Sequence, residues 1–135
     1  MKILFLLTVF LGLAACSPDE SSAGNATIYY IPLGSHTYLP VTMERIETAY
    51  DRFGTPSVSS RSFVRLLELI DRSGPGKLDG QLIRAKIVLP DGESIFIDNL
   101  GGVEMSLREA VKLSDKSYSE VGHLLHRMTK ERTSE

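Results

Sequence analysis

Residues 83–98 read IRAKIVLPDGESIFID and carry the clearest secondary-structure signal in the chain. Between Ile83 and Leu89 the odd-numbered positions are apolar and positions 84 and 86 are charged, which is typical of a half-buried strand. Residues 90–93, Pro-Asp-Gly-Glu, favour a turn, because proline fixes φ and glycine accepts a positive φ. The segment 94–98 then predicts a second strand, antiparallel to the first.

This hairpin predicts a larger sheet when its neighbours are included. Residues 99–102, Asn-Leu-Gly-Gly, form a second turn signal that leads into a strand at 103–105. Residues 110–113 are compatible with one more short strand. Near the N-terminus, residues 26–31 are β-branched and aromatic, which predicts a strand stopped by Pro32. We therefore expect an antiparallel sheet of about four strands.

Three segments predict helices. Apolar residues recur every three or four positions over 61–72, and Ser59 or Ser60 precedes them as an N-cap. The last helix follows Ser114 or Ser117 and extends to about residue 128. Residues 42–50 form either a short helix or an extended segment. This order of elements favours an α+β fold, with about three helices packed on one face of the sheet.

The composition limits the classes of function. The chain has 135 residues, which suits one domain with a buried core. Its 17 acidic and 15 basic residues are nearly balanced, so it lacks the basic field that nucleic-acid binding requires. A single cysteine excludes an internal disulfide and a multi-cysteine zinc site. No segment reaches the roughly 20 apolar residues of a membrane span.

Residues 1–16, MKILFLLTVFLGLAAC, have the pattern of an export signal. Lys2 precedes an apolar run at 3–13 that is too short to cross a bilayer and is followed by small residues. Residues 13–16, Leu-Ala-Ala-Cys, resemble the bacterial lipobox. The resemblance implies that the chain is cut before Cys16, that its thiol receives a diacylglyceryl group, and that the new amine is acylated. An ordinary cleaved signal or an uncleaved anchor is the alternative.

The same resemblance implies a location and a division of the chain. Ser17 after the lipid site resembles an outer-membrane sorting signal, with the protein facing the periplasm, and the inner membrane is the alternative. We expect a signal peptide at 1–15 and a lipidated cysteine with a flexible tether at 16–25. A single α+β domain then covers 26–130, and residues 131–135 form a frayed tail.

The polar residues do not form a recognisable catalytic or metal-binding motif. Glu120, His123 and His126 have metal-ligand side chains at helical spacing, but on a helical wheel they spread over about 120° and are expected to face water. His36 lies in a loop without a nucleophile motif. Asp98 is interpreted as a turn former. The sequence therefore predicts no catalytic residue, no metal site and no cofactor.

Tyrosines near the N-terminus are candidate contact residues. Tyr29 and Tyr30 lie on opposite faces of their predicted strand, so at least one is expected to be exposed. Tyr38 lies in the loop that follows. Exposed tyrosine is enriched at protein interfaces, which makes these three side chains candidates for protein contact. The alternative is that each packs beneath a neighbouring loop.

These observations favour one function and leave two others open. We expect a membrane-anchored, non-enzymatic module that binds another envelope protein. A more specific alternative is an inhibitor or immunity-type lipoprotein that blocks a periplasmic hydrolase. A small enzyme or metal binder that uses His36, or His123 with His126, is the third reading.

Overall fold

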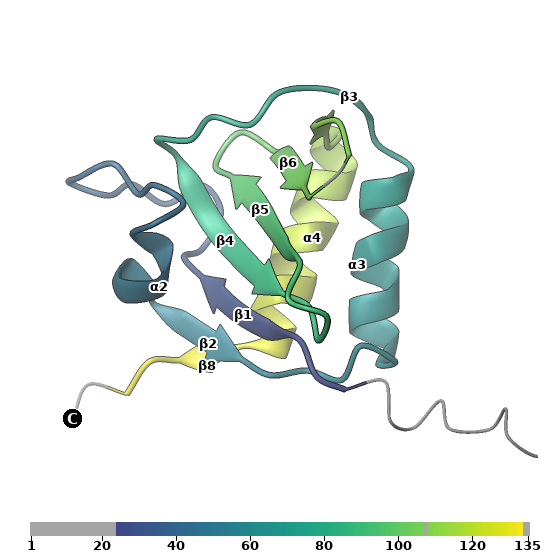
Figure 1. Ribbon diagram of the computed structural model, residues 1–135. Coiled ribbons are helices and arrows are strands. Elements are labelled where there is room, and N and C mark those ends of the chain that lie inside the picture. The colour runs from purple at the N-terminus through teal and green to yellow at the C-terminus, as the bar shows by residue number, and fades with distance from the viewer. Residues whose placement is uncertain (1–23, 107, 134–135) are drawn as a thin grey trace, which may run out of the picture.

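The computed structural model describes residues 24–106 and 108–133, and this part of the chain forms one antiparallel sheet and three α-helices (Figure 1). The helices are α2 (Ile46–Ala49), α3 (Arg61–Asp71) and α4 (Asp115–Met128). The strands are β1 (Thr27–Tyr30), β2 (Arg52–Gly54), β3 (Gly74–Pro75), β4 (Ile83–Val88), β5 (Ser94–Asp98), β6 (Gly102–Met105), β7 (Val111–Lys112) and β8 (Lys130–Glu131).

The sheet is larger than the sequence predicts. Its strand order is β3-β7-β6-β5-β4-β1-β2-β8, so the predicted sheet of about four strands is wrong and eight are present in the described residues. The predicted strands correspond to β1, β4, β5 and β6, and the further short strand allowed at 110–113 corresponds to β7. The other four strands are only two or three residues long, too short to show an alternating pattern. They form because an adjacent strand offers backbone hydrogen-bonding partners.

The two long helices begin where the sequence places their caps. The Ser60 side chain accepts a hydrogen bond from the Phe63 amide at 3.3 Å, and Ser114 accepts one from the Ser117 amide at 3.2 Å. Both helices pack on one face of the sheet, which we call the helix-covered face. Its core contains large side chains with no solvent exposure: Ile28, Phe63, Leu66, Ile87, Ile95, Ile97 and Leu125.

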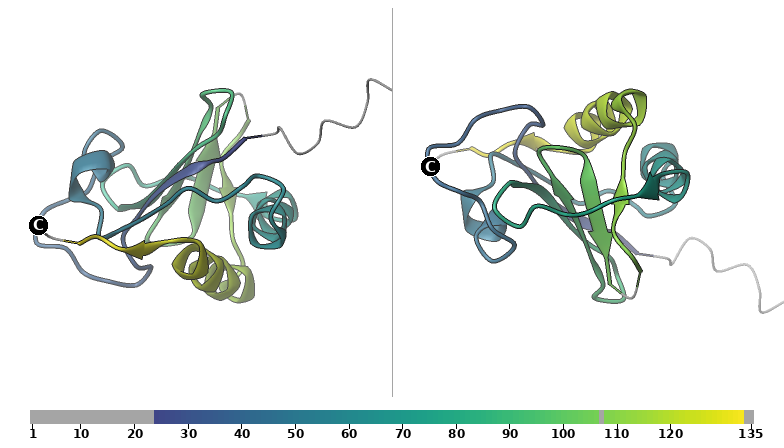
Figure 2. Two further views of the ribbon diagram at one scale, coloured as in Figure 1. Left: turned by 90° about the horizontal axis from the view of Figure 1, so that it is seen from below. Right: turned by 90° about the horizontal axis from the view of Figure 1, so that it is seen from above.

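The short helix α2 lies on the other side of the sheet (Figure 2). Ile46 of α2 packs with Ile31, Val41 and Ile83 in a second, smaller core. The prediction that all the helices share one face is therefore wrong. With one buried residue, α2 is too small to cover this open face: Phe96 of β5 is half-buried and Glu104 of β6 is exposed.

The chain enters β1 at one end of the strand and leaves it at the other, so the segment before β1 and the loop after it lie far apart. Gly24, the first described residue, lies just before β1, and the loop after Tyr30 leaves at the opposite end of the strand (Figure 1). At the C-terminus, part of the predicted frayed tail is ordered: Glu131 belongs to β8, and the Arg132 amide donates to the Asp51 carbonyl at 2.8 Å. None of the helices in the described residues is long and apolar enough to cross a membrane.

Candidate protein-binding surface

A loop with exposed apolar side chains extends from the body of the protein. We call residues 36–43 the projecting loop, which stands out beyond α2 in Figure 1. Tyr38 is fully exposed, Leu39 is 62% exposed and Met43 is 39% exposed. Exposed apolar residues that occur singly are ordinary, but three on one loop mark a candidate contact surface.

The first end of the projecting loop is fixed by side chains from the sheet and its turns. The Gly34 amide donates to Asn99 Oδ1 at 2.7 Å, and Arg84 Nη2 donates to the Ser35 carbonyl at 3.1 Å. Gly34 has φ +84°, a conformation that favours glycine. The chain therefore reaches His36 in a defined direction.

The second end is fixed next to α2. Val41 is buried and forms a parallel bridge with Leu82, and its carbonyl accepts from the Ile83 amide at 2.9 Å. Arg45 Nη1 donates to the Pro40 carbonyl at 2.8 Å. Because both ends are held, the exposed tip has little conformational freedom. Binding of a partner would therefore cost little further conformational entropy in this loop.

Arg84 is an unusual residue to hold this loop, because its side chain is only 2% exposed and no carboxylate in the described residues pairs with it. A bulge between Ile83 and Ala85 turns Arg84 away from the solvent-facing position that simple alternation predicts. Burial lowers the pKa of the guanidinium, partly offset by Tyr118, and Nε has no hydrogen-bond partner among the described residues. Holding the loop thus carries a desolvation cost.

The three candidate tyrosines have different surroundings. Only Tyr38 is fully at the surface. Tyr30 is 2% exposed: its hydroxyl accepts from the Leu33 amide at 3.2 Å and donates to the Gly122 carbonyl at 3.5 Å, and burial raises its pKa. Tyr30 therefore belongs to the core and does not offer a contact surface.

Tyr29 is half-buried in an aromatic cluster on the open face. Its ring centroid lies 5.3 Å from that of Tyr50 and 5.6 Å from that of Phe53, with edge-to-face geometry in both pairs. The guanidinium of Arg132 lies 4.6 Å from the Tyr50 ring. This cluster packs β1 against β2 and the C-terminal segment, so it has a structural role.

The histidines do not form a metal-binding group in the part of the chain that is described. His123 and His126 are exposed beside a groove of about 460 Å³ next to α4, whereas His36 is exposed on the projecting loop. Glu120 is paired with Arg65 at 2.6 Å, and this hydrogen bond lowers the pKa of the carboxyl group. No group of three or more histidine, cysteine, aspartate or glutamate residues is arranged to hold a metal among the described positions.

Asp98 is a turn former, as predicted, and its carboxylate is fully used. Oδ1 accepts from the amides of Leu100 and Gly102, both at 2.8 Å, and Oδ2 accepts from the Asp79 amide at 2.7 Å. The side chain is 1% exposed. It joins the β5–β6 turn to the segment before β4 and is not available for catalysis.

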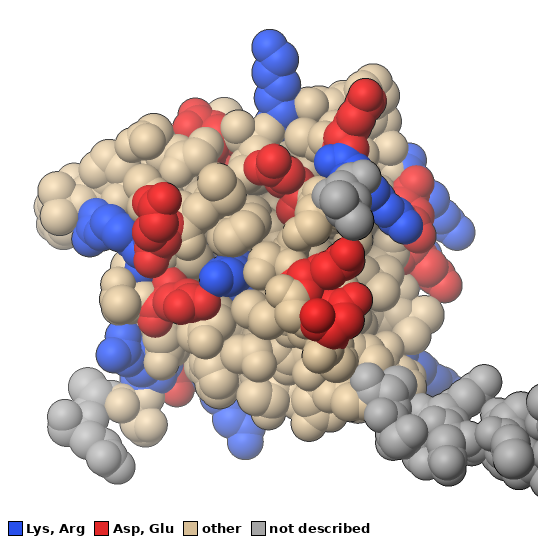
Figure 3. Space-filling model, in the orientation of Figure 1, with Lys and Arg blue, Asp and Glu red and all other residues tan. Residues whose placement is uncertain are grey.

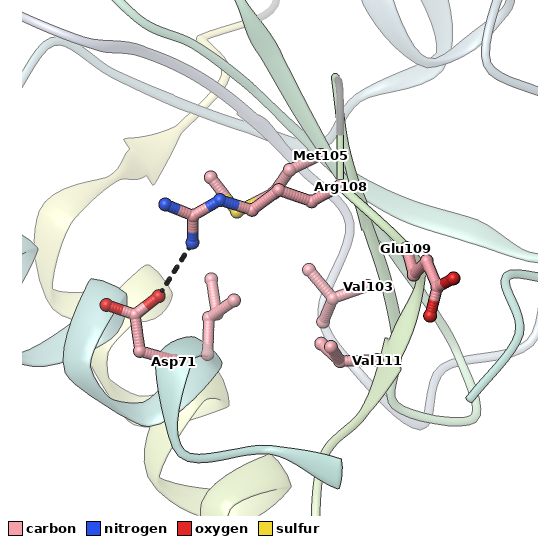
Figure 4. A pocket seen from close by; sticks show the side chains of 7 residues that line it. Asp71, Val103, Met105, Arg108, Glu109 and Val111 are labelled. Atoms are coloured by element: carbon pink, nitrogen blue, oxygen red, sulfur yellow. Dashed lines mark hydrogen bonds and ion pairs between the residues drawn. The ribbon is translucent and has the colours of Figure 1, made fainter. Parts of the chain in front are cut away.

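A small cavity of about 90 Å³ lies between the end of α3 and the strands β6 and β7 (Figure 4). Val103, Met105 and Val111 supply apolar walls, and Arg108 bonds Asp71 at 3.0 Å along one side. The Glu109 side chain points away from the cavity. Two of the polar side chains that line it, those of Arg108 and Asp71, are paired with each other.

Sequence reasoning identified only part of this surface. Leu39 was not singled out, because nothing in a non-periodic loop distinguishes an exposed apolar residue from a buried one. Met43 was included in the possible helix at 42–50, but α2 begins only at Ile46 and Met43 is exposed before it. The two prolines around the loop, Pro32 and Pro40, were the available signal for a projecting segment. Arg84 was missed because a bulge cannot be read from alternation.

Cys16, the predicted lipidation site, lies outside the described residues. Comparisons of the chain with protein-family models, with curated proteins and with solved structures found no match.

Proposed function

We propose that this protein is a lipid-anchored, periplasm-facing lipoprotein that binds another envelope protein through its projecting loop and performs no chemistry itself. The observation that carries the proposal is the full exposure of Tyr38, beside Leu39, on a loop held at both ends. Exposed apolar area is unfavourable in water, at about 25 cal/mol per Å², and a partner that covers it would recover this free energy. Rigid aromatic side chains are typical anchors of interfaces.

The direction of the chain supports the same proposal. A lipid on Cys16 would hold the domain through residues 17–23, which enter at Gly24. The projecting loop lies at the other end of β1, so the point where the tether enters does not obstruct it (Figure 1). Strand addition at a sheet edge is less suited to binding, because the edge strands β3 and β8 have two residues each and β3 includes Pro75.

A second candidate is an inhibitor of a periplasmic hydrolase. The projecting loop is exposed at Tyr38 and Leu39 and fixed at both ends, which suits insertion into the concave site of an enzyme. This candidate predicts a tight complex with a wall-acting hydrolase and protection of cells that make both proteins. Absence of protection against every hydrolase it binds would remove this candidate and leave the binding module.

The test is a crosslinked pull-down of the full-length chain from its own envelope. The unchanged protein is compared with a Tyr38→Ser, Leu39→Ser double variant, with Cys16→Ala, and with Val64→Ser as the control. Val64 is 42% exposed on α3, so its variant removes a similar apolar side chain from a different surface.

We expect one stoichiometric partner with the unchanged protein and with Val64→Ser. Recovery should fall roughly tenfold or more in the double variant, as for interface anchors, and should also fall in Cys16→Ala because the tether is lost. Equal recovery by the unchanged protein and the double variant would contradict the assignment of the loop. Recovery of lipid and bulk envelope protein alone from every version would contradict the proposed function.

A further inference from the structure

Arg84 is a buried cation without a counter-ion. On the face shown in Figure 3, basic side chains lie at the surface, several of them beside acidic groups. Arg84 is only 2% exposed, and no carboxylate lies within 4 Å of its guanidinium in the described segments. Asp98, opposite Ile83 in the neighbouring strand, gives its oxygens to three backbone amides instead. The charge of Arg84 is therefore not neutralised by an ion pair.

A bulge in β4 determines where the Arg84 side chain lies. Ile83 pairs with Asp98 and Ala85 pairs with Ile97, so Arg84 is the extra residue of the bulge. Ile83 packs in the second core on the open face, whereas Ala85 packs in the main core, although regular alternation would place both on one face. The bulge thus changes the direction of the strand's side chains at the point where the guanidinium meets the loop.

Both hydrogen bonds of the Arg84 guanidinium go to main-chain carbonyls. Nη1 donates to the Ile83 carbonyl at 3.0 Å, and Nη2 donates to the Ser35 carbonyl at 3.1 Å. Because a guanidinium is planar and rigid, it fixes the position of the Ser35 carbonyl relative to β4. It offers more N–H donors than these two bonds use, and Nε has no partner among the described residues.

Arg84 holds the residue that comes directly before the projecting loop. The Ser35 amide and hydroxyl both donate to the Pro32 carbonyl, at 3.2 and 2.5 Å, so residues 32–35 form a turn. Asn99 accepts from the Gly34 amide, one residue earlier than the Arg84 contact. The direction in which the chain leaves this turn therefore depends on Arg84 and Asn99.

Stability alone does not account for an arginine at position 84. Burying a charge without a counter-ion costs free energy, and hydrogen bonds to neutral carbonyls recover only part of it. An apolar side chain of similar length, such as methionine, would fill the same space without this cost. The feature that only the guanidinium supplies is the link between β4 and the Ser35 carbonyl.

We propose that Arg84 is a positioning residue of the binding surface: it fixes Ser35 so that Tyr38 and Leu39 are presented in one direction, although its burial lowers the stability of the fold. This inference rests on the proposed function and identifies how the chain orients the loop toward its partner. Removing the guanidinium should change binding and stability differently. A residue with only a structural role would lose both together.

The first measurement follows the loop itself, without a partner. The chain has no tryptophan, so Tyr38→Trp introduces a single fluorophore at the tip of the loop, and Val64→Trp introduces one on α3 as the control. Time-resolved fluorescence anisotropy of the full-length chain is recorded in an uncharged detergent. Each probe is combined with Arg84→Met, with Asn99→Ala and with Arg61→Met, which removes an exposed arginine at the start of α3.

We expect Arg84→Met and Asn99→Ala to increase the amplitude of nanosecond motion of the fluorophore at position 38 but not of the one at position 64. Arg61→Met should change neither. In denaturant titration the midpoint of Arg84→Met should equal or exceed that of the unchanged protein, because the buried charge is gone. Asn99→Ala removes no buried charge, so its midpoint should not rise.

The second measurement is the envelope pull-down, with Tyr38 left unchanged. Arg84→Met should lower recovery of the partner about two- to tenfold, because a loop that is no longer held must be ordered on binding. Arg61→Met should leave the recovery unchanged. Binding then falls in a variant whose stability does not, which is the combination that a structural role alone cannot produce.

Three results would overturn the inference. The first is unchanged motion at position 38 in Arg84→Met, and the second is a midpoint for Arg84→Met below that of Arg61→Met, which includes failure of Arg84→Met to fold. The third is full recovery of the partner by Arg84→Met. The proposed function fails separately, when no version of the chain recovers a partner or when the Tyr38→Ser, Leu39→Ser variant recovers it fully.

Discussion

The helix-covered face of the sheet is closed, whereas the open face is covered only where α2 lies. On the closed side Phe63, Ile87 and Ile97 have no solvent exposure. On the open side Phe96 is half-buried and Met43 is 39% exposed, although both are large and apolar. Burial on the first face accounts for most of the stability, while the second face keeps apolar surface available for a partner. Substitutions on the helix-covered face should therefore reduce stability more than substitutions on the open face.

The largest effect is expected from Phe63→Ala on the helix-covered face. The side chain is fully buried in the main core, so its loss removes apolar burial and leaves a cavity. The free energy of unfolding should fall by about 3–5 kcal/mol, measured by denaturant titration. A loss below about 1 kcal/mol would mean that this face is not closed in solution.

Asp98→Ala should have the next largest effect. It leaves three backbone amides, those of Asp79, Leu100 and Gly102, without their acceptor in a site that is 1% exposed. The expected loss is about 2–3 kcal/mol by the same titration. Asp91→Ala is the control, because Asp91 is exposed and accepts a single amide, from Glu93. Equal losses in the two variants would contradict the role given to Asp98.

Phe96→Ala on the open face should cost only about 1 kcal/mol of stability, because part of the ring is already in water. Denaturant titration measures this loss. A loss of stability comparable to that of Phe63→Ala would remove the contrast between the faces.

The smallest effect concerns pH and the ion pair between α3 and α4. Arg65 lowers the pKa of Glu120 in the folded protein, so the pair stabilises the fold above the unfolded pKa of about 4.3 and loses this contribution as the pH falls through the folded pKa. The melting temperature of Glu120→Gln should therefore be slightly below that of the unchanged protein at pH 7, and this difference should shrink as the pH falls below about 4.3. A difference that does not shrink on acidification would contradict this role of the ion pair.

The regular elements were predictable because their apolar residues repeat. The strand at 83–89 and the helices at 61–72 and 114–128 correspond to β4, α3 and α4, within one residue at most ends. The short strands β2, β3 and β8 were not predictable, because they form by pairing with segments distant in the chain. Phe53 of β2, for example, pairs with Tyr29 and Lys130. Pairing of this kind leaves no local signal.

The candidate surface was only partly predictable for a related reason. Tyr38 was identified by its residue type and loop position, but Tyr30 was included with it although it lies in the core. Alternation assigns residues to faces without saying which face is covered, and the position of α2 on the open face follows from packing of Ile46 with Ile31 and Ile83.

The most direct test is site-specific photo-crosslinking in living cells. A photo-crosslinking amino acid is placed at position 39, on the projecting loop, or at position 64, on the exposed side of α3. We predict a discrete adduct of constant mass from position 39 and none from position 64. The absence of an adduct at position 39, or the same adducts from both positions, would contradict the proposal that the projecting loop binds an envelope protein.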